Sequence, residues 1–176
     1  MTFIKQRSIM RFFLTTCFLL WNFSGVSVGA PDKDQVLRML EGRHWKLDIR
    51  VFNKLGDDAD IILIEIAKND SLMNVIRFRA LEVLSLLPTD KTASFLEDTA
   101  EKAFTPMARR GFEAMKRSFA KTKPERVKQL ATKLLKHRNA NIRISAARYI
   151  RSEDQALFKS FIDTEKESWV RKAVQN

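Results

Sequence analysis

The chain has 176 residues, one cysteine, five glycines and a formal net charge of +11 at pH 7. This length suits a single domain with a hydrophobic core of its own. The single cysteine excludes an internal disulfide framework, and the few glycines form no phosphate-binding loop motif.

Residues 1–30 have the layout of a secretory signal peptide. Three basic residues, Lys5, Arg7 and Arg11, precede any acidic residue, and an apolar run over 12–23 follows them. Small residues then fill 24–30, as expected around a cleavage site. The apolar run is shorter than the roughly 20 residues that a membrane-spanning helix needs.

We therefore predict a signal peptide over residues 1–29 and a mature domain over residues 30–176. This places the protein outside the cytoplasm, in a bacterial periplasm or secreted. Two alternatives stay open: the segment remains as an uncleaved membrane anchor, or the chain is a lipoprotein attached through Cys17. Cys17 is the only cysteine, so the predicted mature domain contains none.

Five times along the chain an apolar or small residue is followed at once by a basic one. The basic members are 31, 32, 34 and 28 residues apart. A period in this range predicts a stacked array of helical repeats. The five pairs are Trp45-Lys46, Ile76-Arg77, Ala108-Arg109, Ile142-Arg143 and Val170-Arg171.

Apolar spacing around these pairs predicts five pairs of helices. The fourth pair has the clearest apolar stripe. Residues 61–66 have the composition of a strand, but their helical neighbours would leave a strand without a partner, so we predict a helix. The predicted pairs are 34–41 with 44–55, 58–68 with 71–87, 90–104 with 106–119, 124–137 with 141–151, and 153–163 with 168–174.

The second-helix patterns resemble those of the HEAT-repeat family. The closest are Ile76-Arg77-x-x-Ala80 and Ile142-Arg143-x-x-Ala146, and the other three pairs are weaker versions. The resemblance runs from about residue 34 to the end of the chain and implies an all-α, right-handed α-solenoid of about five helical hairpins. The chain departs from the family pattern in three repeats: the first has lysine instead of arginine, the third has alanine as the residue before its arginine, and the fifth is truncated.

In HEAT-like arrays the recurring arginines commonly form a ladder, each bonded to an acid or a carbonyl group of a neighbouring element. The resemblance therefore implies a structural role for Arg77, Arg109, Arg143 and Arg171. Contact with a ligand is the alternative role for these four residues.

Charge is unevenly placed along the chain. Residues 31–101 carry a net charge of −4 and residues 152–176 a net charge of −1, whereas residues 102–151 hold 15 basic and only 2 acidic side chains. We expect these cations to repel one another, a cost that an anionic partner would relieve. A solvated surface that promotes solubility is the alternative.

Second helices line the concave face in HEAT-like arrays. The resemblance thus places one set of basic side chains of repeats three and four on a common surface. We predict that this surface binds a partner, through Arg110, Lys116, Arg117, Arg148 and Arg151.

No pattern in the sequence indicates a catalytic or metal site. His44 and His137 lie far apart with no metal-binding spacing near either, and the acidic run at 57–60 lacks the glycine and distal glutamate of a calcium loop. We expect no metal and no cofactor. The truncated fifth repeat is predicted to expose an apolar end that a second copy or the partner could cap, formed by Phe158, Phe161, Ile162, Trp169, Val170 and Val174.

The prediction that follows is an exported, non-enzymatic binding or scaffold module whose basic concave surface holds an acidic protein or an anionic envelope component. A membrane would be contacted only through an uncleaved anchor. One alternative is a HEAT-like array that binds nucleic acid, although a secretion signal directs the chain away from the genome. The other is an enzyme of the HEAT-like lyase kind, for which the sequence supplies no visible site.

Overall fold

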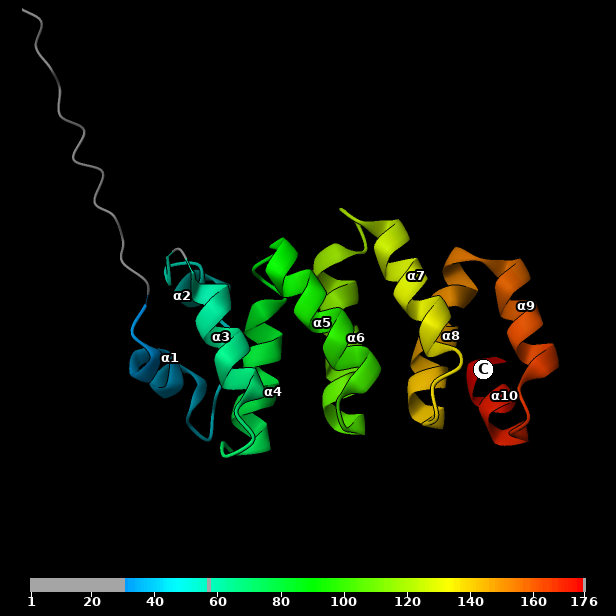
Figure 1. Cartoon of the computed structure of the whole chain (residues 1–176), viewed down its shortest axis with the longest axis horizontal. Coiled ribbons are helices and arrows are strands. Elements are labelled where there is room, and N and C mark those ends of the chain that lie inside the picture. The colour runs from blue at the N-terminus through cyan, green and yellow to red at the C-terminus, as the bar shows by residue number, and fades with distance from the viewer. Residues whose placement is uncertain (1–30, 57, 176) are drawn as a thin grey trace, which may run out of the picture.

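The computed structural model describes residues 31–56 and 58–175. The predicted signal peptide, residues 1–29, and Cys17 within it lie outside these ranges. All regular secondary structure in the described ranges is helical, which confirms the all-α prediction. No helix there is long and apolar enough to cross a membrane. The helices follow one another along the longest dimension of the molecule (Figure 1).

Nine of the ten helices begin and end within three residues of their predicted bounds. Apolar periodicity and the positions of proline and the helix caps are therefore enough to locate most of the elements. The helices are α1 (Lys33–Leu40), α2 (Ile49–Phe52), α3 (Ala59–Lys68), α4 (Asn74–Leu84), α5 (Asp90–Lys102), α6 (Thr105–Phe119), α7 (Pro124–Leu134), α8 (Ala140–Glu153), α9 (Gln155–Thr164) and α10 (Ser168–Gln175).

The helix predicted over residues 44–55 is the exception, because only the single turn α2 forms there. Trp45 explains the difference. Its indole Nε1 donates a hydrogen bond to the carbonyl oxygen of Met39 at 3.0 Å, which ties the chain back to α1. Its ring lies 6.3 Å from that of Phe52. The first of the five sequence pairs, Trp45-Lys46, therefore lies in a loop and does not open a helix.

The segment 61–66 is helical, as predicted, and forms the middle of α3. Leu63 and Ile66 are fully buried on one side of this helix. Asp60, at its first turn, is also buried and accepts a hydrogen bond from Oγ1 of Thr89 at 2.6 Å. Because Thr89 caps the N-terminus of α5, this carboxylate joins α3 to α5.

The helices pack as pairs arranged in two rows. Within a pair, α3 lies against α4, α5 against α6, and α7 against α8. Between pairs, α3, α5 and α7 pack side by side in the first row, and α4, α6, α8 and α10 do so in the second row. The residues of the recurring pattern form the core between the rows, since Ile76, Ala80, Ile142 and Ala146 are all buried.

Gly111 sets how closely α5 and α6 approach each other. A Cβ atom at this position would lie 3.0 Å from Cγ2 of Thr99 and 3.2 Å from the backbone nitrogen of Ala100. Contacts this short are repulsive. A side chain at this point would therefore require Thr99 or the backbone at Ala100 to shift by a few tenths of an ångström.

The C-terminal end exposes less apolar surface than predicted. Phe161, Val170 and Val174 were expected to be exposed, but they are buried. The reason is that α9 and α10 both pack against α8, which covers these side chains. Of the predicted apolar end, Trp169 remains substantially exposed, at 49%.

Candidate functional site

Seven of the fifteen basic side chains in residues 102–151 form ion pairs. Six of these seven pair with acids outside that segment. The acid is four residues away for Lys102 but 22 to 33 residues away for the other five, so proximity in sequence does not reveal those five pairs. The expected repulsion is therefore largely offset around α7. The seven are Lys102, Lys116, Lys123, Arg126, Lys128, Lys133 and Arg143.

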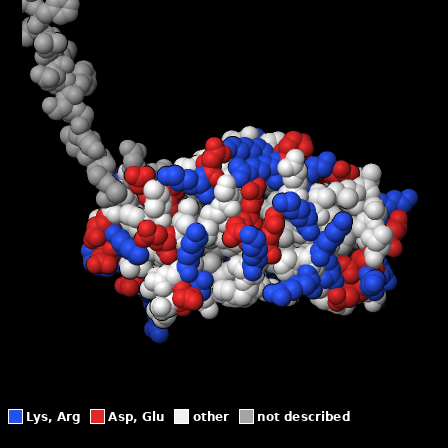
Figure 2. All heavy atoms as spheres, in the orientation of Figure 1, with Lys and Arg blue, Asp and Glu red and all other residues white. Residues whose placement is uncertain are grey.

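The contacts between α5 and α7, in the first row of helices, show how these basic charges are neutralised. Arg126 of α7 makes a bidentate contact with Glu97 of α5, at 2.6 and 2.8 Å, and Lys133 lies 3.0 Å from Glu101. A hydrogen bond from Lys123 holds the pKa of Asp90 below its ordinary value. Figure 2 shows basic and acidic side chains interspersed across the face that it presents.

A hollow of about 490 Å³ lies between α5 and α7. Both of its basic lining residues are already paired internally, since Arg126 contacts Glu97 and Lys133 contacts Glu101. A charged ligand would have to compete with these contacts, so this hollow is a weaker candidate site than its volume suggests.

Three of the four predicted ladder arginines donate to carbonyl groups at the end of the preceding helix. Arg77 Nε donates to Ala67 at 3.0 Å, Arg143 Nη1 donates to His137 at 3.0 Å, and Arg171 Nη1 donates to Glu165. Such contacts satisfy carbonyls that a helix end leaves without partners.

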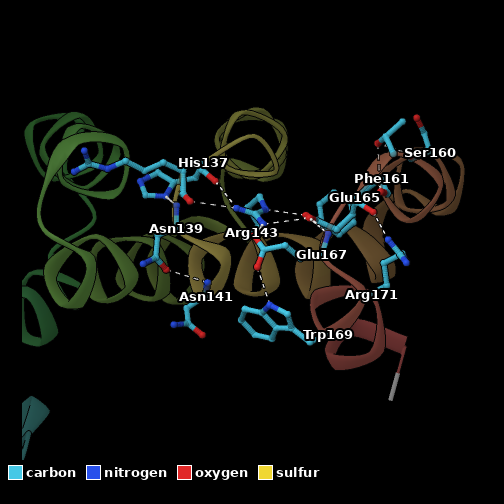
Figure 3. A network of polar contacts seen from close by, with 12 residues as sticks. His137, Asn139, Asn141, Arg143, Ser160, Phe161, Glu165, Glu167, Trp169 and Arg171 are labelled. Atoms are coloured by element: carbon cyan, nitrogen blue, oxygen red, sulfur yellow. Dashed lines mark hydrogen bonds and ion pairs between the residues drawn. The ribbon is translucent and has the colours of Figure 1, made fainter.

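Arg143 also binds two acids in the segment between α9 and α10 (Figure 3). Its guanidinium contacts Glu165 at 2.7 and 3.1 Å and Glu167 at 2.6 Å. The Glu165 side chain is only 5% exposed, and the hydrogen bond from Arg143 is the main cause that lowers its pKa. Glu167 in turn accepts a hydrogen bond from Nε1 of Trp169.

Arg109 differs from the other three ladder positions. Its side chain is exposed, and within the described ranges it makes no hydrogen bond or ion pair. It lies between two hollows on either side of α6, one facing α8 and the other facing α4. Arg109 and Glu113 line both hollows, so the two are adjacent across α6, and we call them together the α6 furrow.

The two hollows of the α6 furrow are similar in size. The one between α6 and α8 has a volume of about 240 Å³, and the one between α4 and α6 about 230 Å³. The first is lined by Arg109, Glu113, Lys116, Asn141, Ile144, Ser145 and Arg148. The second is lined by Glu82, Arg109, Arg110, Glu113, Ala114 and Arg117.

Four of the five residues predicted to form the basic surface line this furrow: Arg110, Lys116, Arg117 and Arg148. The fifth, Arg151, does not, because its Nη1 donates to the carbonyls of Val174 and Gln175 at the end of α10, at 2.7 and 3.2 Å.

Two lining residues of the furrow are fixed by neighbours within the chain. Arg148 Nη2 donates to the carbonyl of Ala173 at 2.9 Å. Lys116 is held by Glu113 at 2.8 Å. Both side chains keep their charge at the hollow, and these contacts limit the directions in which they can point.

Sequence reasoning assigned Arg109 to the structural ladder and did not single out Asn141 or Ser145. The available signal for Arg109 was its seven-residue spacing from Lys116, which places the two on one side of a helix. Asn141 and Ser145 carry no comparable signal, because a neutral polar residue on a helix is ordinary.

Arg110 is held in an unusual way. The centre of its guanidinium lies 4.1 Å from the centroid of the Phe78 ring. Its Nε is buried, and no acceptor for it exists among the residues described. Stacking on an aromatic ring leaves the edge of a guanidinium available for a planar acceptor such as a carboxylate.

Comparisons with models of known families, with curated proteins and with solved structures find no match. In the described part of the chain, no group of three or more histidine, cysteine, aspartate or glutamate side chains is placed to hold a metal ion. The charge and shape of the α6 furrow are therefore the features of the chain that bear on its function.

Proposed function

We propose that this protein is a non-enzymatic binding module that holds an acidic partner in the α6 furrow. The observation that carries the proposal is the charge of the furrow: five cations line it against the two acids Glu82 and Glu113. Six of the ten basic side chains elsewhere in residues 102–151 have acidic partners within the chain. In the furrow, Arg109, Arg110, Arg117 and Arg148 have no ion-pair partner among the described residues, so four unmatched cations lie together at this surface.

The module is a right-handed HEAT-like solenoid of about five helical hairpins in this proposal. Two features support it. Consecutive helices pack as pairs whose members form two rows, and arginines of the recurring pattern bind carbonyls at the end of the preceding helix. In such an array the second row lines the inner face, which is the row that carries the furrow.

Export from the cytoplasm completes the proposal. Its support is the order of basic, apolar and small residues over 1–30. The partner is then an acidic protein or an anionic component of the cell envelope. An unmatched cationic patch destabilises the folded state by self-repulsion, and such a partner would relieve this repulsion.

The test uses the full-length chain expressed in a Gram-negative host. Arg109→Glu combined with Arg117→Glu reverses two exposed furrow charges that have no internal partner within the described ranges. The matched control is Lys136→Glu combined with Arg138→Glu, which changes the net charge equally at two exposed positions outside the furrow.

Cells are fractionated, the N-terminus of the protein is sequenced, and co-purifying molecules are identified by mass spectrometry. We expect a chain processed near Ala30 in the periplasm, and an acidic partner that the furrow variant loses and the control retains. A partner retained by both variants, or lost by both, contradicts the role of the furrow. An unprocessed cytoplasmic chain contradicts export.

A further inference from the structure

We infer that the partner is an extended acidic peptide segment with carboxylate side chains at every third residue, one for each hollow of the α6 furrow. This inference rests on the proposed function and makes it more specific. It follows from the spacing of the hollows, the way Arg110 is held, and the acids that lie among the cations.

The distance between the two hollows favours carboxylates that are three residues apart in the peptide. The hollows lie on opposite sides of α6, so their centres are about one interhelical distance apart, roughly 8–10 Å. A chain in the polyproline II conformation rises about 3.1 Å per residue with three residues per turn, so side chains i and i+3 project alike about 9 Å apart. In a β-strand, residues on one face are separated by about 7 or 13 Å, and neither distance fits.

The occupant must also be thin. The side chains shared by both hollows, Arg109 and Glu113, stand between them on α6. A helix about 10–12 Å in diameter would rest on these two side chains and could not place its own side chains in both hollows. An extended chain can cross them and place one side chain on each side.

Arg110 is the anchor of the hollow between α4 and α6. Stacking on Phe78 holds its guanidinium in place, so a carboxylate would bind it at a low cost in side-chain entropy. Arg117, two turns further along α6, lies in the same hollow and adds a second cation.

The hollow between α6 and α8 offers a second carboxylate site of different composition. Arg148 is oriented there by its bond to the carbonyl of Ala173, and Arg109 is exposed beside it. Asn141 and Ser145 contribute neutral hydrogen-bonding groups. A carboxylate placed here would meet Arg109, Arg148 and two neutral polar side chains, beside the ion pair of Lys116 with Glu113.

The acids of the furrow favour a peptide over a continuous anionic surface. Glu82 and Glu113 line the furrow among the cations, and they would repel an unbroken row of phosphates or a lipid headgroup layer. Carboxylates separated by neutral residues place fewer negative charges near these two acids. No aromatic side chain is among the lining residues described for either hollow, so nucleobases would have no ring to stack on.

The experiment compares two labelled peptides of about 12 residues with the same composition, built from glutamate, alanine and proline to favour an extended chain. One has glutamate at every third position, and the other has all its glutamates in one block. Binding is measured by fluorescence anisotropy at low and at physiological salt. We expect the spaced peptide to bind at least about tenfold more tightly than the block peptide.

Arg110→Lys is the diagnostic variant, because lysine keeps the charge but lacks the planar fork that stacks and binds carboxylates in a bidentate manner. It should weaken the spaced peptide about tenfold and leave the block peptide unchanged. Arg138→Lys is the matched conservative control and should change neither. Circular dichroism and thermal melting verify that both variants fold.

The outcomes separate this inference from the proposed function. Equal binding of both peptides, lost in Arg109→Glu/Arg117→Glu, overturns the three-residue spacing and leaves the furrow as an acidic-partner site. If the chain binds only phosphatidylglycerol vesicles or duplex DNA, and that variant again loses the binding, the inference that the partner is a peptide is wrong. If that variant binds every anion as the unmodified chain does, both proposals fail.

Discussion

At the scale of single residues, Arg143 connects three parts of the chain. It donates to a carbonyl group that follows α7 and to two carboxylates between α9 and α10. Its side chain is only 12% exposed, and that of Glu165 only 5%. Water therefore screens this ion pair much less than it screens a pair on the surface.

Replacing Arg143 by methionine should destabilise the fold by about 3 kcal/mol, because the buried carboxylate of Glu165 loses its partner. Arg77→Met is the comparison, since Arg77 bonds a carbonyl and a side-chain amide but no carboxylate. Its loss should cost about 1 kcal/mol. Urea unfolding measures both changes, and equal losses would mean that the carboxylates contribute little.

The same pair predicts a dependence of stability on pH. Because Arg143 lowers the pKa of Glu165 in the folded state, its contribution is complete above the ordinary glutamate pKa of about 4.3. It is lost as the pH falls below that value through the lowered folded-state pKa.

Glu165→Gln should therefore lose stability at pH 7 and show a shallower decline between about pH 5 and pH 3. The measurement is a series of urea unfolding curves for the variant and the unmodified chain. Asp154, whose pKa is lowered chiefly by the backbone N–H of Leu157, contributes with the same sign in both proteins. Parallel curves for the two proteins would contradict the role of Glu165.

At the scale of elements, the contact between α5 and α6 depends on the absence of a side chain at position 111. Gly111→Ala should destabilise the fold by about 1–3 kcal/mol through overpacking against Thr99. This is expected even though alanine is favoured over glycine within a helix by about 1 kcal/mol. Thermal and urea unfolding provide the measurement.

Thr99→Ser removes the methyl group that an alanine at position 111 would meet at 3.0 Å. Adding it to Gly111→Ala should recover part of the loss, with full recovery blocked by the backbone nitrogen of Ala100 at 3.2 Å. A Gly111→Ala protein as stable as the unmodified chain would show that the two helices can separate at no cost.

Most elements could be predicted from the sequence because their burial follows a helical period. Ile76 with Ala80, and Ile142 with Ala146, mark sides of α4 and α8 that are buried in the structure. The same reasoning overextended α2, since Phe52 and Leu55 are indeed buried there. Spacing identifies which side chains are buried, but it does not show that Trp45 ties the preceding loop back to α1.

The α6 furrow could be predicted only in part. The spacing of basic residues along α6 placed Arg110 and Arg117 on a common surface, and both line one hollow. The outcome for Arg151 could not be foreseen, because its acceptors are backbone carbonyls at the end of α10. Backbone groups at a helix end carry no signature in the side-chain pattern.

At the scale of the whole molecule, most contacts join helices that are one or two positions apart in chain order. Removing one helix should therefore destabilise mainly the helices next to it. Truncation before Ser168 removes α10, whose buried Val170 and Val174 pack against α8. It also removes the carbonyl acceptors of Arg148 and Arg151.

We expect this truncated chain to lose hydrogen-exchange protection in α8 and α9 and to retain it in α3 to α6. Segment-resolved hydrogen exchange of the truncated and full chains makes the measurement, and Trp169→Ala, an exposed change within α10, serves as the control. A uniform loss of protection along the truncated chain would show instead that the helices unfold as a single cooperative unit.

The ion pairs that join α1 to α3 and α5 to α7 connect residues at nearly the same separation in the sequence. Lys33 with Glu65 and Glu101 with Lys133 are both 32 residues apart, and Glu97 with Arg126 are 29 apart. The order of charge is not the same, since the basic residue comes first in the pair of α1 with α3 and the acid comes first in the pairs of α5 with α7. A duplicate of the α7 segment inserted directly after α7 would therefore set the basic side chains of the new copy against those of the original, so the common separation alone does not let the chain lengthen by whole segments.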